Sequence, residues 1–179
     1  PSFWGANPAT VSIFIEGGPV AGTRVLGKEE QLAFDLLNDF DASQLRAAIT
    51  SEKAPAEYRA AGQPQPPHSA PEGLAAAQMS DAQRKTLLSL LEEYNSHLHP
   101  SLVRERMAEI NAAGIDRVYF SWAGATKPGV GHYYRVQGPT FVLELINTQS
   151  DPAGNPANHI HSVWRSLQGD FAVPVVEAK

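Results

Sequence analysis

The sequence predicts an α+β fold in which an antiparallel sheet in the C-terminal third packs with a helical hairpin and further N-terminal helices. Two patterns carry this prediction. Apolar residues recur with helical spacing between residues 87 and 110, whereas apolar and polar residues alternate along short runs between residues 118 and 166. The composition fits a soluble, packed protein, because 42% of the 179 residues are hydrophobic and 18% are charged.

The N-terminal part predicts one strand and two helices. Alternation over residues 11–15 predicts a short strand, which Gly17-Gly18-Pro19 ends. Residues 26–40 have helical periodicity. Asp41 with Gln44 resembles a capping box that starts a second helix over residues 42–49.

Residues 51–79 change in character, because prolines crowd this stretch and no apolar period is present. We expect an exposed Pro-rich loop that crosses the surface. The length of the chain fits one domain over residues 1–179, or the C-terminal part of a longer one.

A helical hairpin is predicted after this loop. Ser80 with Gln83 forms a second capping box, and an amphipathic stripe follows as far as residue 98. Pro100 ends that helix and opens the next one, which Gly114 terminates. The rest of the chain predicts four strands, near residues 118–122, 132–137, 141–146 and 158–166. Their short connections predict an antiparallel meander.

Composition also excludes some functions. The net charge of −5 argues against nucleic acid as a partner, and no apolar run is long enough to cross a membrane. The chain contains no cysteine, so a metal ion would need His, Asp, Glu or neutral oxygen ligands. The chain opens on Pro1-Ser2-Phe3-Trp4 without a basic and apolar leader, from which we expect a mature or trimmed product without a signal peptide.

The principal candidate for chemistry is His159-Ile160-His161. Residues two apart on a strand point to the same face, and their Cα atoms lie roughly 6.5–7 Å apart. Two imidazoles at this spacing can converge on one metal ion. The structural alternative is that both histidines make ordinary hydrogen bonds at an edge or surface.

Three further residues are candidates around this pair. His132 opens the second strand and would be a third metal ligand if that strand lies near the fourth. Glu144 stands between apolar neighbours, where it could be a ligand, a general base or a partner that orients a histidine, or it could pair with Arg135 or Arg165. Arg165 shares the face of His159 and His161 and could anchor an anionic group of a substrate. Copper, zinc and iron all suit imidazole ligands, so the metal stays open.

Several segments together resemble a bacterial family catalogued as domain of unknown function 3500. They are the opening residues 1–8, residues 120–124, His132 to Phe141, Glu144 with Asn147-Thr148-Gln149, and Asn158 to Arg165. The resemblance spans nearly the whole chain but corresponds to the C-terminal portion of longer members, whose additional N-terminal region has its own histidine-rich segment. It implies that further ligands or strands come from that region, and that the periplasm or the extracellular space is a compatible location. Residues 150–157 form an insertion relative to the family pattern.

Three functions follow as hypotheses. In the first, the chain is a metal-dependent enzyme that performs hydrolysis or redox chemistry on a small molecule. In the second, it is a non-enzymatic binding or assembly module whose strand edges pair with a second chain or with the N-terminal region. In the third, it is a metal-free hydrolase acting on a small ester or sugar.

Overall fold

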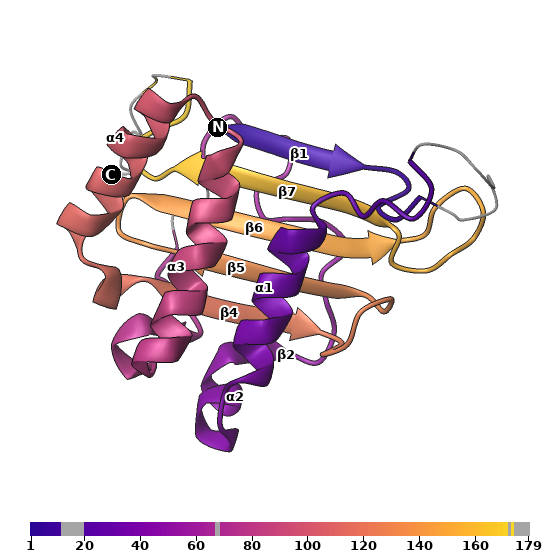
Figure 1. The fold of residues 1–179 in the computed structure, drawn as a ribbon, viewed down its shortest axis with the longest axis horizontal. Helices are drawn as coiled ribbons and strands as arrows, with labels where there is room; N and C mark the ends of the chain where they lie inside the picture. The colour runs from indigo at the N-terminus through magenta and orange to yellow at the C-terminus, as the bar shows by residue number, and fades with distance from the viewer. Residues whose placement is uncertain (12–19, 67–68, 172, 174–179) are drawn as a thin grey trace.

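The structure of the chain is a computed structural model that describes residues 1–11, 20–66, 69–171 and 173. Most of the strand predicted over residues 11–15, and the turn at Gly17-Gly18-Pro19, lie outside the described residues. The α+β prediction is confirmed, because the described residues form four α-helices and a seven-stranded mixed sheet (Figure 1).

The sheet has the order β1-β7-β6-β5-β4-β2, and β3 pairs separately with β4. The strands from β4 to β7 form the predicted antiparallel meander. The sequence did not predict three outer strands: β1, which is antiparallel to β7, β2, which is parallel to β4, and β3. The bounds are β1 Ser2–Ala6, β2 Ile49–Ser51, β3 Leu74–Ala75, β4 Tyr119–Gly124, β5 His132–Gln137, β6 Phe141–Gln149 and β7 His159–Ser166.

The helices begin and end where the sequence places their caps. Both predicted capping boxes are present, Asp41 with Gln44 at α2 and Ser80 with Gln83 at α3. Pro100 opens α4, and Gly114 ends it with a φ of 92°. The bounds are α1 Gly27–Asn38, α2 Ala42–Ala48, α3 Asp81–Ser96 and α4 Pro100–Ala113, with short 3₁₀ turns at Ala76–Gln78 and Ile115–Arg117.

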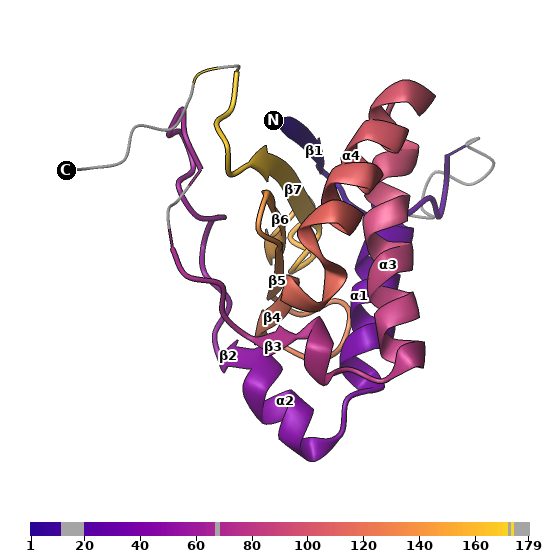
Figure 2. The same ribbon diagram turned by 90° about the vertical axis from the view of Figure 1, so that its left-hand side faces the viewer.

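The helices cover one face of the sheet, which we call the helix face. Figure 2 shows α1, α3 and α4 together on this side. Alternate strand residues enter the core here, among them Trp122, Tyr134, Leu145 and Trp164, each at most 3% exposed. These residues form the larger core, although β5 is buried along its whole length and therefore on both faces.

The opposite face, which we call the loop face, is covered by residues 52–66 and 69–73 (Figure 2). We call these residues the covering segment. Parts of this stretch are exposed, as at residues 51–53 and 61–64, whereas other parts pack on the sheet: Tyr58 packs against the cluster that contains Tyr133 and Ile146, and the backbone N–H of Arg59 donates to Glu144. The sequence pattern did not indicate these contacts, because they are made by single side chains and main-chain groups and so produce no periodic apolar signal.

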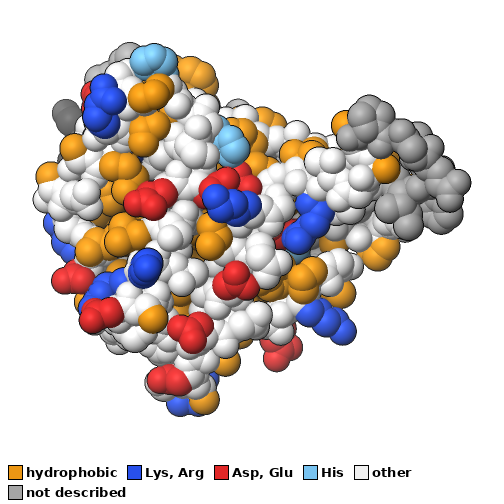
Figure 3. All heavy atoms as spheres, viewed as in Figure 1, with side chains coloured by type: hydrophobic (Ala, Val, Ile, Leu, Met, Phe, Trp, Pro, Cys, Tyr) orange, Lys and Arg blue, Asp and Glu red, His pale blue; other side chains and the backbone are white. Residues whose placement is uncertain are grey.

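The outer surface of the helices carries intermixed acidic and basic side chains (Figure 3). None of the helices in the described part of the chain is both long and apolar enough to cross a membrane.

Candidate functional site

Strand β7 places the rings of His159 and His161 together on the loop face. Both side chains are partly exposed, and their ring centroids lie 4.6 Å apart with the planes at 85°. The Nε2 atom of each ring lies 3.0 Å from that of the other. The two-residue period therefore brings the same nitrogen of both imidazoles to one point, as the spacing predicts.

Neighbouring residues on β1 and the covering segment hold the His161 ring. Gly5 lies opposite His161 in the register of β1 and β7, and a Cβ atom at Gly5 would approach the His161 ring to 3.2 Å. The Phe3 ring packs at 5.5 Å from the ring of His161. On its other side, Nδ1 of His161 lies 3.6 Å from a carboxylate oxygen of Glu57. A carboxylate facing Nδ1 favours a proton there and leaves the Nε2 lone pair available.

The geometry of the pair fits a shared metal ion. Two imidazole nitrogens bound at about 2.0–2.1 Å to one ion, at an angle of roughly 90–110°, lie about 2.9–3.4 Å apart. The observed separation of 3.0 Å falls in this range. A direct hydrogen bond between two neutral rings has the same length, so the distance agrees with a shared metal ion and with a hydrogen bond. A measurement of metal binding distinguishes these two arrangements.

Glu144 lies on the same face, on the strand next to β7. The register pairs Glu144 with Val163 and Ile146 with His161, so Glu144 and His161 are diagonal neighbours. The Glu144 side chain is fully buried, and its Oε1 accepts hydrogen bonds from the Tyr133 hydroxyl and the Arg59 backbone N–H. Burial, together with the Glu144 charge, raises the pKa of the Tyr133 hydroxyl, so it stays protonated and donates.

The centre of the loop face holds polar groups without partners. Arg135 is 1% exposed, burial lowers its pKa, and among the described residues no ion pair within 4.0 Å joins Glu144 to either Arg135 or Arg165. Within that same part of the chain, hydrogen-bond partners are missing for Arg135 Nε and Nη1, Ser121 Oγ, Gln137 Oε1 and Glu144 Oε2. Buried groups of this kind need water, an ion or a ligand, because leaving them unpaired is costly.

Arg165 does not have the free guanidinium expected of a substrate anchor. It is 4% exposed, its Nε donates to Asp170 at 2.6 Å, and its two terminal nitrogens donate to the carbonyls of Ala60 and Gln63. These contacts tie the covering segment and the residues after β7 to the sheet, and the anchor role stays a prediction.

His132 lies on the other side of the sheet, so it cannot complete a ligand set with His159 and His161. Strand β6 separates β5 from β7, and the His132 ring stacks on Trp122 at 5.5 Å under helix α1. Its Nδ1 lies 2.8 Å from the Val130 carbonyl, and its Nε2 lies 3.1 Å from a Glu30 oxygen without the alignment of a hydrogen bond. The alternation within one strand fixes which residues share a face, but it does not relate the faces of two strands.

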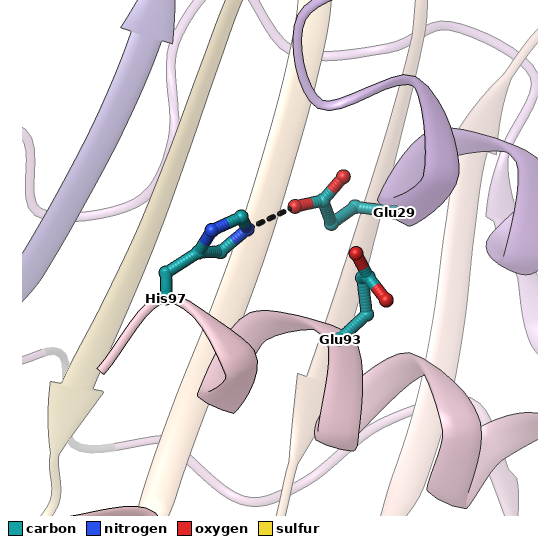
Figure 4. Close-up of side chains that lie close together, drawn as sticks. All are labelled: Glu29, Glu93 and His97. Carbon is teal, nitrogen blue, oxygen red and sulfur yellow. Dashed lines mark hydrogen bonds and ion pairs between the residues drawn. The ribbon is translucent and has the colours of Figure 1, made fainter. Parts of the chain in front are cut away.

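A second cluster of metal-ligand types lies on the helix side of the molecule. Figure 4 shows Glu29 of α1 facing Glu93 and His97 at the end of α3, with one ligand atom of each within 4.8 Å of the others. His97 Nε2 lies 2.6 Å from Glu29, and Lys28 pairs with Glu93. The carboxylates are thus partnered within the protein, which suits a clamp between two helices. His99 caps the start of α4, where its side chain accepts from the backbone N–H of Ser101.

The sequence reasoning did not identify Glu29, Glu30, Glu57 or Arg59 as site residues. For Glu29 and Glu30 the sequence did contain a signal, because two glutamates open a helix whose next turn is apolar. In the structure these two residues are only 3% and 8% exposed. Nothing in the local sequence marks Glu57 or Arg59, whose roles depend on how the covering segment folds back.

The comparisons with known proteins bear on the whole chain. No match is found among curated proteins or among solved structures. A family model described as protein of unknown function (DUF3500) matches residues 1–173, which includes the histidine pair, Glu144 and the covering segment. The chain therefore belongs to the DUF3500 family, as the resemblance of its segments indicates.

Proposed function

We propose that this protein binds a divalent transition-metal ion through Nε2 of His159 and His161, and that the ion is the centre of an activity toward a small molecule. The observation that carries the proposal is the 3.0 Å separation of two nitrogens that face one point. Copper, zinc and iron all accept two imidazoles, so the donor set defines a class of metals.

The surroundings of the pair support a functional ion more than a purely structural one. Structural zinc sites are closed by four protein ligands, whereas catalytic sites keep positions open for water or substrate. Among the described residues, Glu29, Glu93 and His97 are the only three metal-ligand side chains close enough to share an ion, so the pair on β7 offers two protein ligands. An ion held in this way has open positions, and it would supply Lewis-acid or redox chemistry when bound.

Glu144 would contribute a proton acceptor beside this centre. Its Oε1 is occupied by Tyr133 and Arg59, and its Oε2 has no donor among the described residues. A carboxylate oxygen with a free lone pair can accept a proton from water or substrate. We assign Arg165 no part in the proposal, because its contacts with Asp170, Ala60 and Gln63 tie it to the protein.

The test is metal binding by the whole chain. The protein is stripped with a chelator and loaded separately with Zn²⁺, Cu²⁺ and Fe²⁺, and the retained metal is then counted by mass spectrometry. We expect one ion per chain for at least one metal and none in the His159→Ala/His161→Ala double variant. Glu57→Gln should weaken binding by about tenfold, because carboxylates that orient a ligand typically contribute 10–100-fold.

His97→Ala and His99→Ala are the matched controls, since both remove an imidazole outside the pair and should leave the stoichiometry unchanged. Retention of the ion by the double variant would refute the proposal. Loss of the ion in His97→Ala alone would move the metal site to the cluster of Glu29, Glu93 and His97.

The position of β1 favours a second candidate function, a binding or assembly module. β1 is the terminal strand of the sheet, and Phe3 on it is 56% exposed. An edge strand offers unpaired backbone groups to another chain. Native mass measurement separates the two candidates: a metal-binding monomer supports the first, and a metal-free obligate complex supports the second.

A further inference from the structure

A cavity of about 410 Å³ lies at the end of the sheet where β7 begins, close to the histidine pair, because Asn158 precedes His159 and Asn147 pairs with Ile160. Residues 9–11 and 22–25, which precede helix α1, form one side, and residues 155–158, which precede β7, form another. Its polar lining includes Glu30 from α1, Asn147 from β6 and Arg24. The volume lies at the lower end of the roughly 300–1,000 Å³ found for small-molecule sites, so a small ligand would fill it.

Glu30 is a fixed negative charge in this cavity. It is only 8% exposed, yet one oxygen accepts from Arg24 at 2.6 Å and the other from Asn147 at 3.0 Å, with His132 behind it at 3.1 Å. Burial alone would raise the pKa of Glu30, but His132, Asn147 and Arg24 outweigh it and lower the pKa to about 2. Each carboxylate oxygen has two lone pairs and can also accept from a ligand.

Asn147 presents an acceptor that the protein does not satisfy. Its Nδ2 donates to Glu30, and its Oδ1 meets no hydrogen-bond donor in the described part of the chain although the residue is 4% exposed. The amide cannot be turned to relieve this, because turning it would bring Oδ1 against the Glu30 carboxylate. Asn147 is a lining residue of the cavity, and a ligand donor that reaches its buried Oδ1 would satisfy this acceptor.

Arg24 supplies the complementary donors and balances the charge. Only one of its terminal nitrogens is bound to Glu30, and its side chain is 39% exposed. A guanidinium carries five N–H donors, and Glu30 is the side chain that accepts from Arg24 within the described residues, so further donors can serve a ligand. Arg24 and Glu30 cancel in charge, so a ligand needs groups that both donate and accept but no net charge.

We propose that this cavity binds a neutral, hydroxyl-rich molecule the size of a monosaccharide. A hydroxyl group donates to Asn147 Oδ1 or Glu30 while accepting from Arg24, which an ammonium or a carboxylate cannot do. The remaining lining includes Val25, Pro128 and Ala157, which suit the C–H surfaces of such a ligand. Asn147 lies on the helix face and the histidine pair on the loop face, so the contacts proposed for this ligand do not involve a metal at the pair.

The experiment is calorimetric titration of the full chain with D-glucose, D-mannose and myo-inositol, beside ethanolamine as a cation and acetate as an anion. We expect at least one polyol to bind and neither charged probe to do so. Asn147→Ala should weaken that binding about tenfold, the equivalent of about 1.4 kcal/mol. Asn38→Ala, on the exposed end of α1, is the matched control and should bind like the wild type.

Glu30→Gln should also weaken polyol binding. If this variant fails to fold, Asn147→Ala still tests the proposal. It removes a side-chain amide whose Oδ1 has no donor within the described residues. The proposal is overturned if none of the polyols binds, if ethanolamine or acetate binds in their place, or if Asn147→Ala leaves the polyol affinity unchanged.

Discussion

The two faces of the sheet are built by the same strands but bury different kinds of side chain. On the helix face, aromatic and aliphatic side chains interlock with α1 and α3, and the ring of Trp122 stacks with those of Tyr134 and His132. On the loop face, alternate residues of the same strands include Arg135 and Glu144, which are buried without all their partners. The helix face is therefore mostly apolar, with unpaired atoms among the described residues only at its end near His132 and Asn147, whereas the centre of the loop face holds buried charged side chains that folding alone does not explain.

The largest effect on stability should come from the helix face. Trp122→Ala removes a side chain that is 0% exposed and leaves a cavity between the sheet and α1. We expect the free energy of unfolding to fall by about 3–5 kcal/mol, measured by urea denaturation. Phe3→Ala, at a residue that is 56% exposed, is the control and should change it far less. A small loss in Trp122→Ala would show that the helix layer is not the main source of stability.

The next largest effect on stability should come from the Glu30 carboxylate, a buried charge on the helix side that has hydrogen-bond partners. Glu30 has its pKa lowered from 4.5 to about 2, because contacts with His132, Asn147 and Arg24 overcome its burial. A carboxylate with a depressed pKa stabilises the fold above pH 4.5 and loses that contribution as pH falls to about 2. The shift corresponds to about 3 kcal/mol at neutral pH.

Glu30→Gln should therefore be less stable than the wild type at pH 7, and the difference should shrink between pH 4.5 and about 2. Urea denaturation of both proteins at a series of pH values measures it. Glu109→Gln, on α4, is the control for loss of a carboxylate elsewhere. A difference that does not depend on pH would mean that shape, and not charge, is what Glu30 contributes.

The third effect brings the histidine pair into the comparison. If His159 and His161 hold an ion only in the folded state, Zn²⁺ at 100 times its dissociation constant should raise the free energy of unfolding by about 2.7 kcal/mol. The His159→Ala/His161→Ala variant should show no rise, and without metal it should be nearly as stable as the wild type because both rings are partly exposed. An equal rise in the variant would place the metal elsewhere.

The contrast between the faces also explains how much could be predicted from the sequence. Helix caps and the meander are local patterns, so Asp41, Ser80 and Gly114 mark ends that the structure confirms. β1 escaped prediction because Ser2–Ala6 lacks a clear alternation and becomes a strand only by pairing with β7. The three-residue β2 and two-residue β3 are too short for any period to appear.

The site shows the same limit. That His159 and His161 share a face follows from the two-residue period within one strand. Whether His132 lies on the same face as this pair depends on the register and order of three strands, and the sequence of one strand does not determine these. The contacts of Arg165 with Ala60 and Gln63 depend on a segment a hundred residues away in sequence.

The smallest effect should come from removing the charges of the loop face together. Arg135→Met with Glu144→Gln replaces two buried charges by neutral side chains of similar shape, and the Gln carbonyl can still accept from Tyr133. Replacing buried charges in this way is often neutral or stabilising, so we expect a change below about 1 kcal/mol in urea denaturation. Glu144→Gln alone should be less stable than the double variant, because it leaves the Arg135 guanidinium buried without a nearby anion. A loss in the double variant as large as that of Trp122→Ala would mean that these charges hold the fold together. A neutral result would leave function as the reason for their burial.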